Sequence, residues 1–319
     1  MRRRRKKRDF LGQTVELGSP KLMSELSFHF PIHKFSPYVA LFIENARWLL
    51  TYEHFRGNSY EDLVRRVDRL NTFIDCIRMG VKTKEFQAAL DKYHRQPDDN
   101  YASLMVYINQ LLDNHSKLLV IRLDLAYAKD CNNYYLNENE LYEKYWQAKM
   151  DMDHLLNNTR SNKTIFEHKV GHAWKLEYAR GTGFHYHMFF FYNGSMVRED
   201  VTIAKMIGEY WVNTITKGRG RYFNCNDKKD AYKYRGIGML SNRDPRVSEL
   251  ITGLKLAATY LTKPDAYSSV KLNLPDDGHM FGKGEAKPKG TRGRPRINSE
   301  IDSSGTAIDQ DRDNSNCRI

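Results

Sequence analysis

Apolar residues in the first third of the chain recur at the spacing of a helix. Ser59 to Asp62 resembles a capping box. Apolar side chains then follow at steps of four and three residues: Leu63, Val67, Leu70, Ile74 and Ile77. This pattern predicts a helical region over residues 36–112, behind an irregular basic arm over residues 1–35. The stripe requires a partner surface, either its own helical neighbours or the next domain. Gln96 to Asn100 predicts a break between two helices.

From Ser116 onward the apolar pattern changes to a period of two, which is typical of strands. Residues 118–125 are the first predicted strand. Leu119, Ile121, Leu123 and Leu125 share one of its faces, and Arg122 and Asp124 share the other. Two aromatic-rich strands are predicted at 172–179 and 184–192. Arg180 to Gly183 is typical of a hairpin turn between them.

Predicted helices alternate with these strands. One helix carries its apolar stripe between the first strand and the hairpin, at Leu141, Tyr145, Ala148, Met152 and Leu155. The hairpin is followed by a helix over 199–215, short strands near 220–225 and 233–240, and a last helix over 246–263 that Pro264 ends. This order predicts an α+β fold, in which helices cover an antiparallel sheet, for a domain spanning residues 113–275. The polar composition of residues 276–319 predicts a disordered tail.

Charge and composition narrow the class of partner. Lys and Arg outnumber Asp and Glu by 51 to 39, giving a net charge of +12 and favouring a polyanion such as nucleic acid. A basic protein without such a partner is also consistent with this balance. Four widely spaced cysteines, Cys76, Cys131, Cys225 and Cys317, argue against a disulfide framework or a cysteine zinc site. They fit a reducing compartment.

Two features bear on location. No apolar run approaches the ~20 residues of a membrane span, so no membrane partner is expected. The basic run from Arg2 to Arg8 is not followed by a long apolar segment, which argues against a secretory signal. This run is consistent with phosphate contacts, with a nuclear address in a eukaryote, or with a solvated arm.

Candidate chemistry begins with His185 and His187, which alternate along a predicted strand and so point to the same side, about 7 Å apart. Two such imidazoles can hold one divalent ion, although histidines in sheets often have no ligand. If Glu177 pairs across from His185, the apolar residues of both strands face one side. Lys175, Glu177 and both histidines then face the other, as a three-ligand site. The alternative is a solvent-facing Glu177 paired with a lysine.

The last predicted helix contains Tyr260 and Lys263. They are three residues apart and lie on neighbouring turns, at the flank of the stripe formed by Leu250, Leu254, Ala257 and Leu261. Tyrosine is a weak nucleophile with an ordinary pKa of about 10. A nearby ammonium stabilises its phenolate, and a metal can polarise a phosphate under attack.

Together these segments, over residues 116–265, resemble the HUH endonuclease superfamily, and in particular its rolling-circle replication initiators. Within this superfamily, the run from Trp174 to Phe191 is most similar to the inovirus-type replication proteins and the YagK/YfjJ-type proteins of bacterial prophage islands. The resemblance is carried by the apolar strand 118–125, by His185-Tyr186-His187 with Glu177 upstream, and by Tyr260 to Lys263. It departs from the family at Arg122 and Asp124, where many initiators have Thr, and in having one tyrosine in the third motif.

The resemblance implies a sheet of the ferredoxin or RRM type and a function in replication. Mg²⁺ or Mn²⁺ would bind Glu177, His185 and His187. Tyr260, assisted by Lys263, would nick single-stranded origin DNA through a 5′-phosphotyrosyl intermediate and rejoin it. It also implies a bacterial host cytoplasm and host replication proteins as further partners. No nucleotide is expected, because the chain has no Gly-x-x-x-x-Gly-Lys loop.

Several residues are candidates for DNA contact. Arg122, Asp124 and Lys175 lie on the site face, although Arg122 and Asp124 could instead pair with each other. Phe189 and Phe191 could stack bases, but core packing is the favoured role. In the tail, Arg292, Arg294 and Arg296 resemble an AT-hook core that enters the minor groove, and a plain linker is an equal alternative.

Other folds and functions fit less well. A cupin site needs a Glu shortly after the second His, a histidine-triad hydrolase needs a His at 189, and a zinc deaminase needs paired cysteines. The serious alternative is a non-catalytic DNA-binding regulator on the same fold. A transposase or relaxase of the same superfamily is the other alternative.

Overall fold

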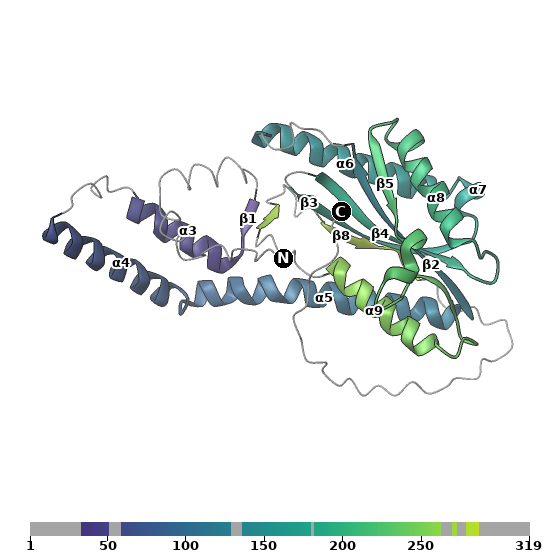
Figure 1. The fold of residues 1–319 in the computed structure, drawn as a ribbon, viewed down its shortest axis with the longest axis horizontal. Coiled ribbons are helices and arrows are strands. Elements are labelled where there is room, and N and C mark those ends of the chain that lie inside the picture. Colours follow the sequence, from purple (N-terminus) through teal and green to yellow (C-terminus); the bar gives the residue numbers. More distant parts are fainter. Residues whose placement is uncertain are drawn as a thin grey trace, which may run out of the picture. The chain divides into compact units, whose positions relative to one another are not determined.

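The larger of the two described sheets is antiparallel, has six strands and carries helices on both faces (Figure 1). The structure is a computed structural model, and it describes residues 33–50, 59–128, 136–179, 182–262, 270–272 and 279–286. The α+β class predicted from the sequence is confirmed, and so is a helical region ahead of the sheet. No helix within these ranges is both long and apolar enough to cross a membrane.

Among the described residues, three helices precede the sheet: α3 (Pro37–Leu50), α4 (Tyr60–Gly80) and α5 (Lys84–Asn114). The capping box predicted for α4 is present, because the Ser59 hydroxyl accepts a hydrogen bond from the backbone N–H of Asp62 at 3.1 Å. In return, the Asp62 carboxylate accepts one from the backbone N–H of Ser59. Both bonds satisfy donors that a helix N-terminus otherwise leaves unpaired.

The predicted break at Pro97 is wrong, since α5 continues through this residue. Proline inside a helix costs about 3 kcal/mol, because it lacks the N–H donor and crowds the preceding turn. The helix gains more from packing on both sides of the proline. Phe86 packs on Tyr38 before it, and four large side chains after it are buried: Leu104, Tyr107, Ile108 and Leu111. Each burial contributes about 1.5–3 kcal/mol, which outweighs the local cost.

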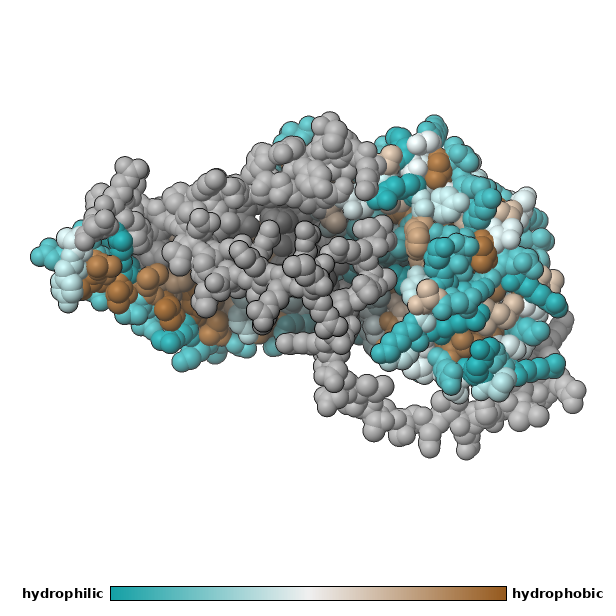
Figure 2. All heavy atoms as spheres, in the orientation of Figure 1, coloured by the Kyte–Doolittle hydropathy of each residue, from teal (hydrophilic) through white to brown (hydrophobic). Residues whose placement is uncertain are grey.

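The apolar stripe of α4 remains largely uncovered in the described part of the chain. Leu63, Val67, Leu70 and Ile74 are each 42–54% exposed. They form part of the brown surface that follows α4 in Figure 2. On another side of the helix, Phe73 packs against Phe42 of α3, with ring centroids 5.4 Å apart. The described neighbours of α4 therefore cover only part of its apolar surface.

The sheet has the order β5-β2-β4-β3-β8, and β6 pairs with the start of β2. Its strands are β2 (Lys117–Tyr127), β3 (Lys169–Ala179), β4 (Gly183–Asn193), β5 (Gly220–Asn224), β6 (Gly238–Ser241) and β8 (Phe281–Lys283). The strands predicted from the sequence are confirmed, with the fourth and fifth shorter than expected. A separate pair joins β1 (His33–Phe35) to β7 (Val270–Leu272), in segments for which the sequence pattern predicts no strand.

The prediction of disorder after residue 276 is wrong for residues 281–283, which form β8. Phe281, Gly282 and Lys283 pair with residues 173–175 of β3, and the Leu176 N–H donates to the Met280 carbonyl at 2.7 Å. These backbone bonds, together with packing of Phe281 on the core, order a segment whose composition is polar. The remaining tail, from residue 287, lies outside the described residues.

Each face of the sheet has its own apolar core. On one face lie α6 (Glu138–Asn158), α7 (Lys163–Phe166), α8 (Asp200–Tyr210) and the π-helical turn η3 (Trp211–Ile215). All five apolar residues predicted for the stripe of α6 are buried. On the opposite face lie the second half of α5 and α9 (Val247–Thr262). A 3-10 helix, η4 (Cys225–Ala231), follows β5.

Helix α9 packs against the segment before β6 through a close contact between two glycines. Gly253 of α9 faces Gly236 so closely that a Cβ on either would overlap the backbone of residues 235–236 or 253–254. The buried side chains of α9 include Leu250, Leu254 and Leu261. The absence of a side chain at position 253 thus sets how closely α9, which carries Tyr260, approaches the segment that leads into β6.

We expect Gly253→Ala to lower the free energy of unfolding by about 1–3 kcal/mol, because the added methyl group has no space. Thermal or denaturant unfolding measures this. Thr252→Ala is the matched control on the exposed side of the same helix, and should change stability by less than about 0.5 kcal/mol. Equal stability of Gly253→Ala and wild type would contradict the close approach.

Candidate metal centre

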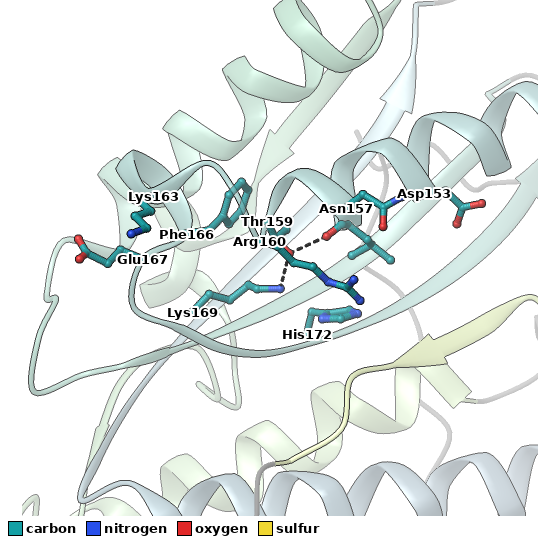
Figure 3. Close-up of a pocket in the computed structure, with 10 residues that line it drawn as sticks. Asp153, Asn157, Thr159, Arg160, Lys163, Phe166, Glu167, Lys169 and His172 are labelled. Atoms are coloured by element: carbon teal, nitrogen blue, oxygen red, sulfur yellow. Dashed lines mark hydrogen bonds between the residues drawn. The ribbon is translucent and has the colours of Figure 1, made fainter.

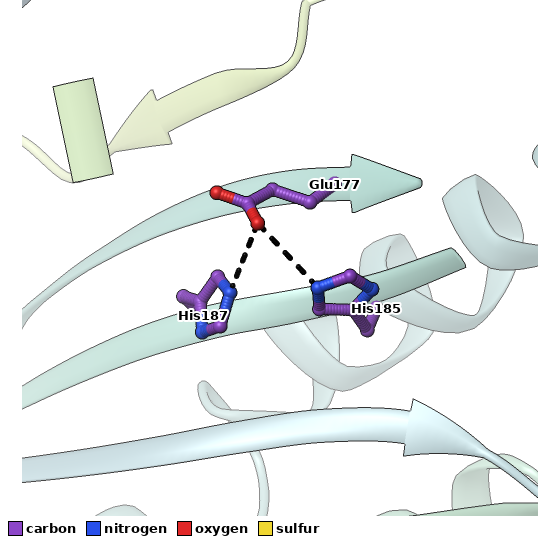
Figure 4. Close-up of side chains that lie close together, drawn as sticks. All are labelled: Glu177, His185 and His187. Atoms are coloured by element: carbon purple, nitrogen blue, oxygen red, sulfur yellow. Dashed lines mark hydrogen bonds and ion pairs between the residues drawn. The ribbon is translucent and has the colours of Figure 1, made fainter. Parts of the chain in front are cut away.

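Two neighbouring strands bring the candidate ligands together. In the register of β3 and β4, Glu177 pairs with His185 and Lys175 pairs with His187, which confirms the pairing predicted from the sequence. Because alternate residues share a face, all four side chains lie on the face that carries α5 and α9. One ligand atom each from Glu177, His185 and His187 lies within 4.8 Å of the others (Figure 4).

Glu177 lies between the two imidazoles and a lysine. Its Oε2 atom is 3.3 Å from Nε2 of His187 and 3.5 Å from Nε2 of His185. Its Oε1 atom forms an ion pair with Nζ of Lys175. The residue is only 9% exposed. Glu177 therefore meets both histidines and a lysine, and the lysine contact occurs in a buried site rather than in solvent.

The opposite nitrogen of each imidazole is held by an oxygen acceptor. Nδ1 of His187 lies 2.6 Å from Oδ1 of Asp124, and Nδ1 of His185 lies 3.1 Å from the Gly183 carbonyl oxygen. An N–H at Nδ1 donates to each acceptor, so both rings present Nε2 towards Glu177. Such outer contacts fix the tautomer and orientation of a metal-binding histidine.

The position of Asp124 in the structure differs from the exposed position that the sequence pattern indicates. The sequence pattern makes it a candidate DNA contact, whereas the structure buries it at 7% exposure against His187. It reaches this position because β2 pairs with β4, with Asp124 opposite His187. These residues are 63 positions apart, and no local pattern indicates that β2 and β4 are neighbours.

The cluster carries strongly perturbed acidities. Burial disfavours a charged His187, but hydrogen bonds to Asp124 and Glu177 outweigh it and raise the pKa of His187 to about 9. Burial likewise disfavours the carboxylate of Glu177, yet hydrogen bonds from His185 and His187 and the charge of Lys175 hold its pKa below the usual range. The hydrogen bond and charge of His187 similarly overcome burial to lower the pKa of Asp124.

These donors fit a divalent cation. Two imidazole nitrogens and a carboxylate oxygen converge from one face, and the second nitrogen of each ring is already engaged. A cation between them would replace the proton that His187 shares with Glu177. Imidazole and carboxylate together suit borderline to hard ions.

Tyr260 lies beside this cluster, on α9. Its ring centroid is 5.1 Å from that of His187, with the planes nearly perpendicular. The guanidinium carbon of Arg122 is 5.2 Å from the ring centroid, and Nζ of Lys175 is 5.9 Å from it. The residue is 47% exposed. A candidate nucleophile accessible to solvent thus lies next to the candidate metal ligands, with two cations against its ring.

Arg122 has a buried Nε atom without a hydrogen-bond partner among the described residues. Phe189 and Phe191 are fully buried in the core, which confirms the packing role favoured from the sequence. Lys263, Arg292, Arg294 and Arg296 lie outside the described residues.

Comparison with known proteins identifies one related family. Residues 82–233, just under half of the chain, match the family of the YagK/YfjJ C-terminal domain. The matched segment contains Glu177, His185 and His187 and ends before α9, so Tyr260 lies beyond it. No curated protein and no solved structure matches the chain at a significant level.

We expect Asp124→Asn to weaken Mn²⁺ binding about 10–100-fold, because the amide holds His187 less firmly and lowers its basicity. Titration with Mn²⁺, followed by electron paramagnetic resonance, measures the affinity. The control is Asp151→Asn, which alters another buried carboxylate that bonds to Tyr127 and Arg219. Unchanged Mn²⁺ affinity in Asp124→Asn would exclude a positioning role.

We expect Mn²⁺ to raise the melting temperature of the wild-type protein, and Glu177→Gln to abolish that rise, because the neutral amide removes the anionic ligand. Thermal unfolding with Mn²⁺ and with chelator provides the test. Glu209→Gln, an exposed change on α8, should leave the rise intact. A rise that survives in Glu177→Gln would mean that Mn²⁺ binds elsewhere.

Proposed function

We propose that this protein is a metal-dependent DNA-nicking enzyme that uses Tyr260 as its nucleophile and initiates rolling-circle replication. The observation that carries the proposal is the position of Tyr260, with its ring centroid 5.1 Å from His187 of the Glu177, His185 and His187 cluster. Support also comes from the net charge of +12 and from the similarity in motif order to HUH endonucleases.

Glu177, His185 and His187 would hold the metal, Mg²⁺ or Mn²⁺. When bound, the cation supplies Lewis-acid polarisation of the scissile phosphate. Asp124 and the Gly183 carbonyl keep the two imidazoles in the orientation that binding requires. Arg122 and Lys175, both close to the Tyr260 ring, are placed to neutralise charge on a phosphate brought to that tyrosine. We assign the same role to Lys263.

The reaction exchanges one phosphodiester for another. The Tyr260 hydroxyl oxygen attacks phosphorus, a phosphotyrosyl bond forms, and the bond from phosphorus to the 3′ oxygen breaks. The phenolic proton ends on the departing 3′ oxygen. Because the number of phosphoester bonds is unchanged, attack by a 3′-hydroxyl reverses the step and rejoins the strand. The free 3′-hydroxyl is the end from which a polymerase would extend.

Covalent capture tests this proposal. Wild-type protein is mixed with single-stranded DNA from the genome that encodes it, with Mn²⁺ or with chelator, and separated under denaturing conditions. We expect a protein–DNA band that needs metal and is absent in Tyr260→Phe, because the variant lacks the attacking oxygen. Tyr60→Phe, a change at a tyrosine that is 81% exposed on α4, should retain the band. Mass spectrometry of the digested complex should place the nucleotide on Tyr260.

Other outcomes are equally informative. A band that persists in Tyr260→Phe would show that another residue is the nucleophile. Tight binding without any covalent product, on DNA covering the whole genome, would favour the non-catalytic regulator. A product that forms equally well with chelator would remove the metal from the mechanism.

A further inference from the structure

A second polar site lies on the other face of the sheet, between the end of α6, α7 and the start of β3 (Figure 3). It is a cavity of about 800 Å³. Its charged and titratable lining consists of Asp153, Arg160, Lys163, Glu167, Lys169 and His172. Lys169 is eight positions before Glu177 on β3, roughly 25 Å at the rise of a strand. The cavity is therefore distinct from the metal centre.

Cations in this cavity lack anionic partners among the described residues. Lys169 is half-buried, and its Nζ donates to the Thr159 hydroxyl at 2.8 Å and forms no ion pair with any described carboxylate. Arg160 and Lys163 likewise form no ion pair with a described residue. In Figure 3 the side chains of Arg160 and Lys169 approach each other above His172. Lysine is seldom buried unless it is paired.

The two carboxylates of the cavity do not compensate for Lys169. Asp153 and Glu167 are both exposed. The nearest basic group to Glu167 is His168, at 3.9 Å. Three cations therefore face two exposed carboxylates, whose charges are screened by solvent. Lys169 is the least exposed of the three cations, so solvent screens its charge the least.

The acidities of the two half-buried groups agree with this arrangement. Burial, together with the charge of Arg160, lowers the pKa of Lys169 to about 8. Burial and the charge of Lys169 lower the pKa of His172 to about 3. Both pKa values are lowered, as expected for basic groups that are partly buried and lie close together.

We propose that this cavity binds a phosphate group, with Lys169 at its floor and Arg160 and Lys163 at its rim. A phosphate would supply the missing negative charge and accept hydrogen bonds from Lys169, Arg160 and the neutral imidazole of His172. The cavity is large enough for a nucleotide-sized ligand. The phosphate can belong to a DNA strand or to a free phosphorylated ligand, and the same chemistry recognises both.

The first test uses inorganic phosphate and the full chain, in chelator so that no metal-bound phosphate contributes. We expect phosphate to raise the melting temperature above that in chloride of equal ionic strength. Lys169→Met should abolish this rise and weaken phosphate binding tenfold or more, on the order expected for loss of a charge-assisted hydrogen bond. Lys205→Met, a change at an exposed lysine on α8, should preserve it.

Stability without phosphate separates the proposal from a purely structural role. If the cavity is an anion-binding site, we expect Lys169→Met without phosphate to be at least as stable as the wild type. The substitution removes a half-buried cation that has no ion pair with a described carboxylate. A less stable Lys169→Met variant, with no effect of phosphate on the wild type, would show that Lys169 merely holds Thr159 at the end of α6. That result would overturn the proposal. Arg160→Gln, at an exposed position, provides a second variant that should fold and should weaken phosphate binding.

Two further probes distinguish the sources. A single-stranded oligonucleotide that competes with phosphate, and binds less tightly to Lys169→Met, would identify the DNA backbone as the ligand. A mononucleotide that competes while oligonucleotide affinity is insensitive to Lys169→Met would identify a free ligand. Failure of all three probes to bind at this cavity would overturn the proposal, and would leave covalent capture by Tyr260 unaffected.

Discussion

The pairing of β4 with its two neighbours is the constraint on which the site depends. A shift of one residue between β3 and β4 would turn Glu177 to the face opposite both histidines. A similar shift between β2 and β4 would remove Asp124 from His187. The large apolar residues prevent both shifts, because Tyr186, Met188 and Phe190 fill the core on one side while Phe189 and Phe191 fill it on the other. The hydrophobic packing of a strand buried on both faces thus fixes the positions of its polar residues.

This fixed register holds several charged groups together where water has little access. Asp124, His187, Glu177 and Lys175 form a continuous chain of contacts, in which each charge meets an opposite one. Burying any member alone would cost several kcal/mol. A divalent ion fits this arrangement because it would substitute for positive charge that the cluster already holds on His187. Tyr260, by contrast, comes from a separate helix whose position depends on the contact between Gly236 and Gly253.

Much of this arrangement follows from local sequence patterns. Alternation of apolar residues predicts the strands, and the division of the hairpin residues between two faces predicts the pairing of Glu177 with His185. Three features are inaccessible to such patterns because they depend on distant parts of the chain. Helix α5 crosses Pro97 because its two halves gain packing elsewhere, β8 becomes ordered only against β3, and Asp124 meets His187 only when β2 and β4 are adjacent. The phosphate cavity likewise joins residues of α6, α7 and β3 that carry no motif.

Strand β8 also bears on how copies of this protein behave in concentrated solution. Strands β2, β3 and β4 are each 11 residues long. One edge of β3 pairs only with β8, which has three residues. An open edge of a long strand offers unpaired backbone groups to any other chain with the same pattern. By occupying residues 173–175, β8 leaves less of that edge for strand exchange between molecules. A chain cut before residue 279 would therefore keep the metal ligands and Tyr260 but lose part of its protection against self-association.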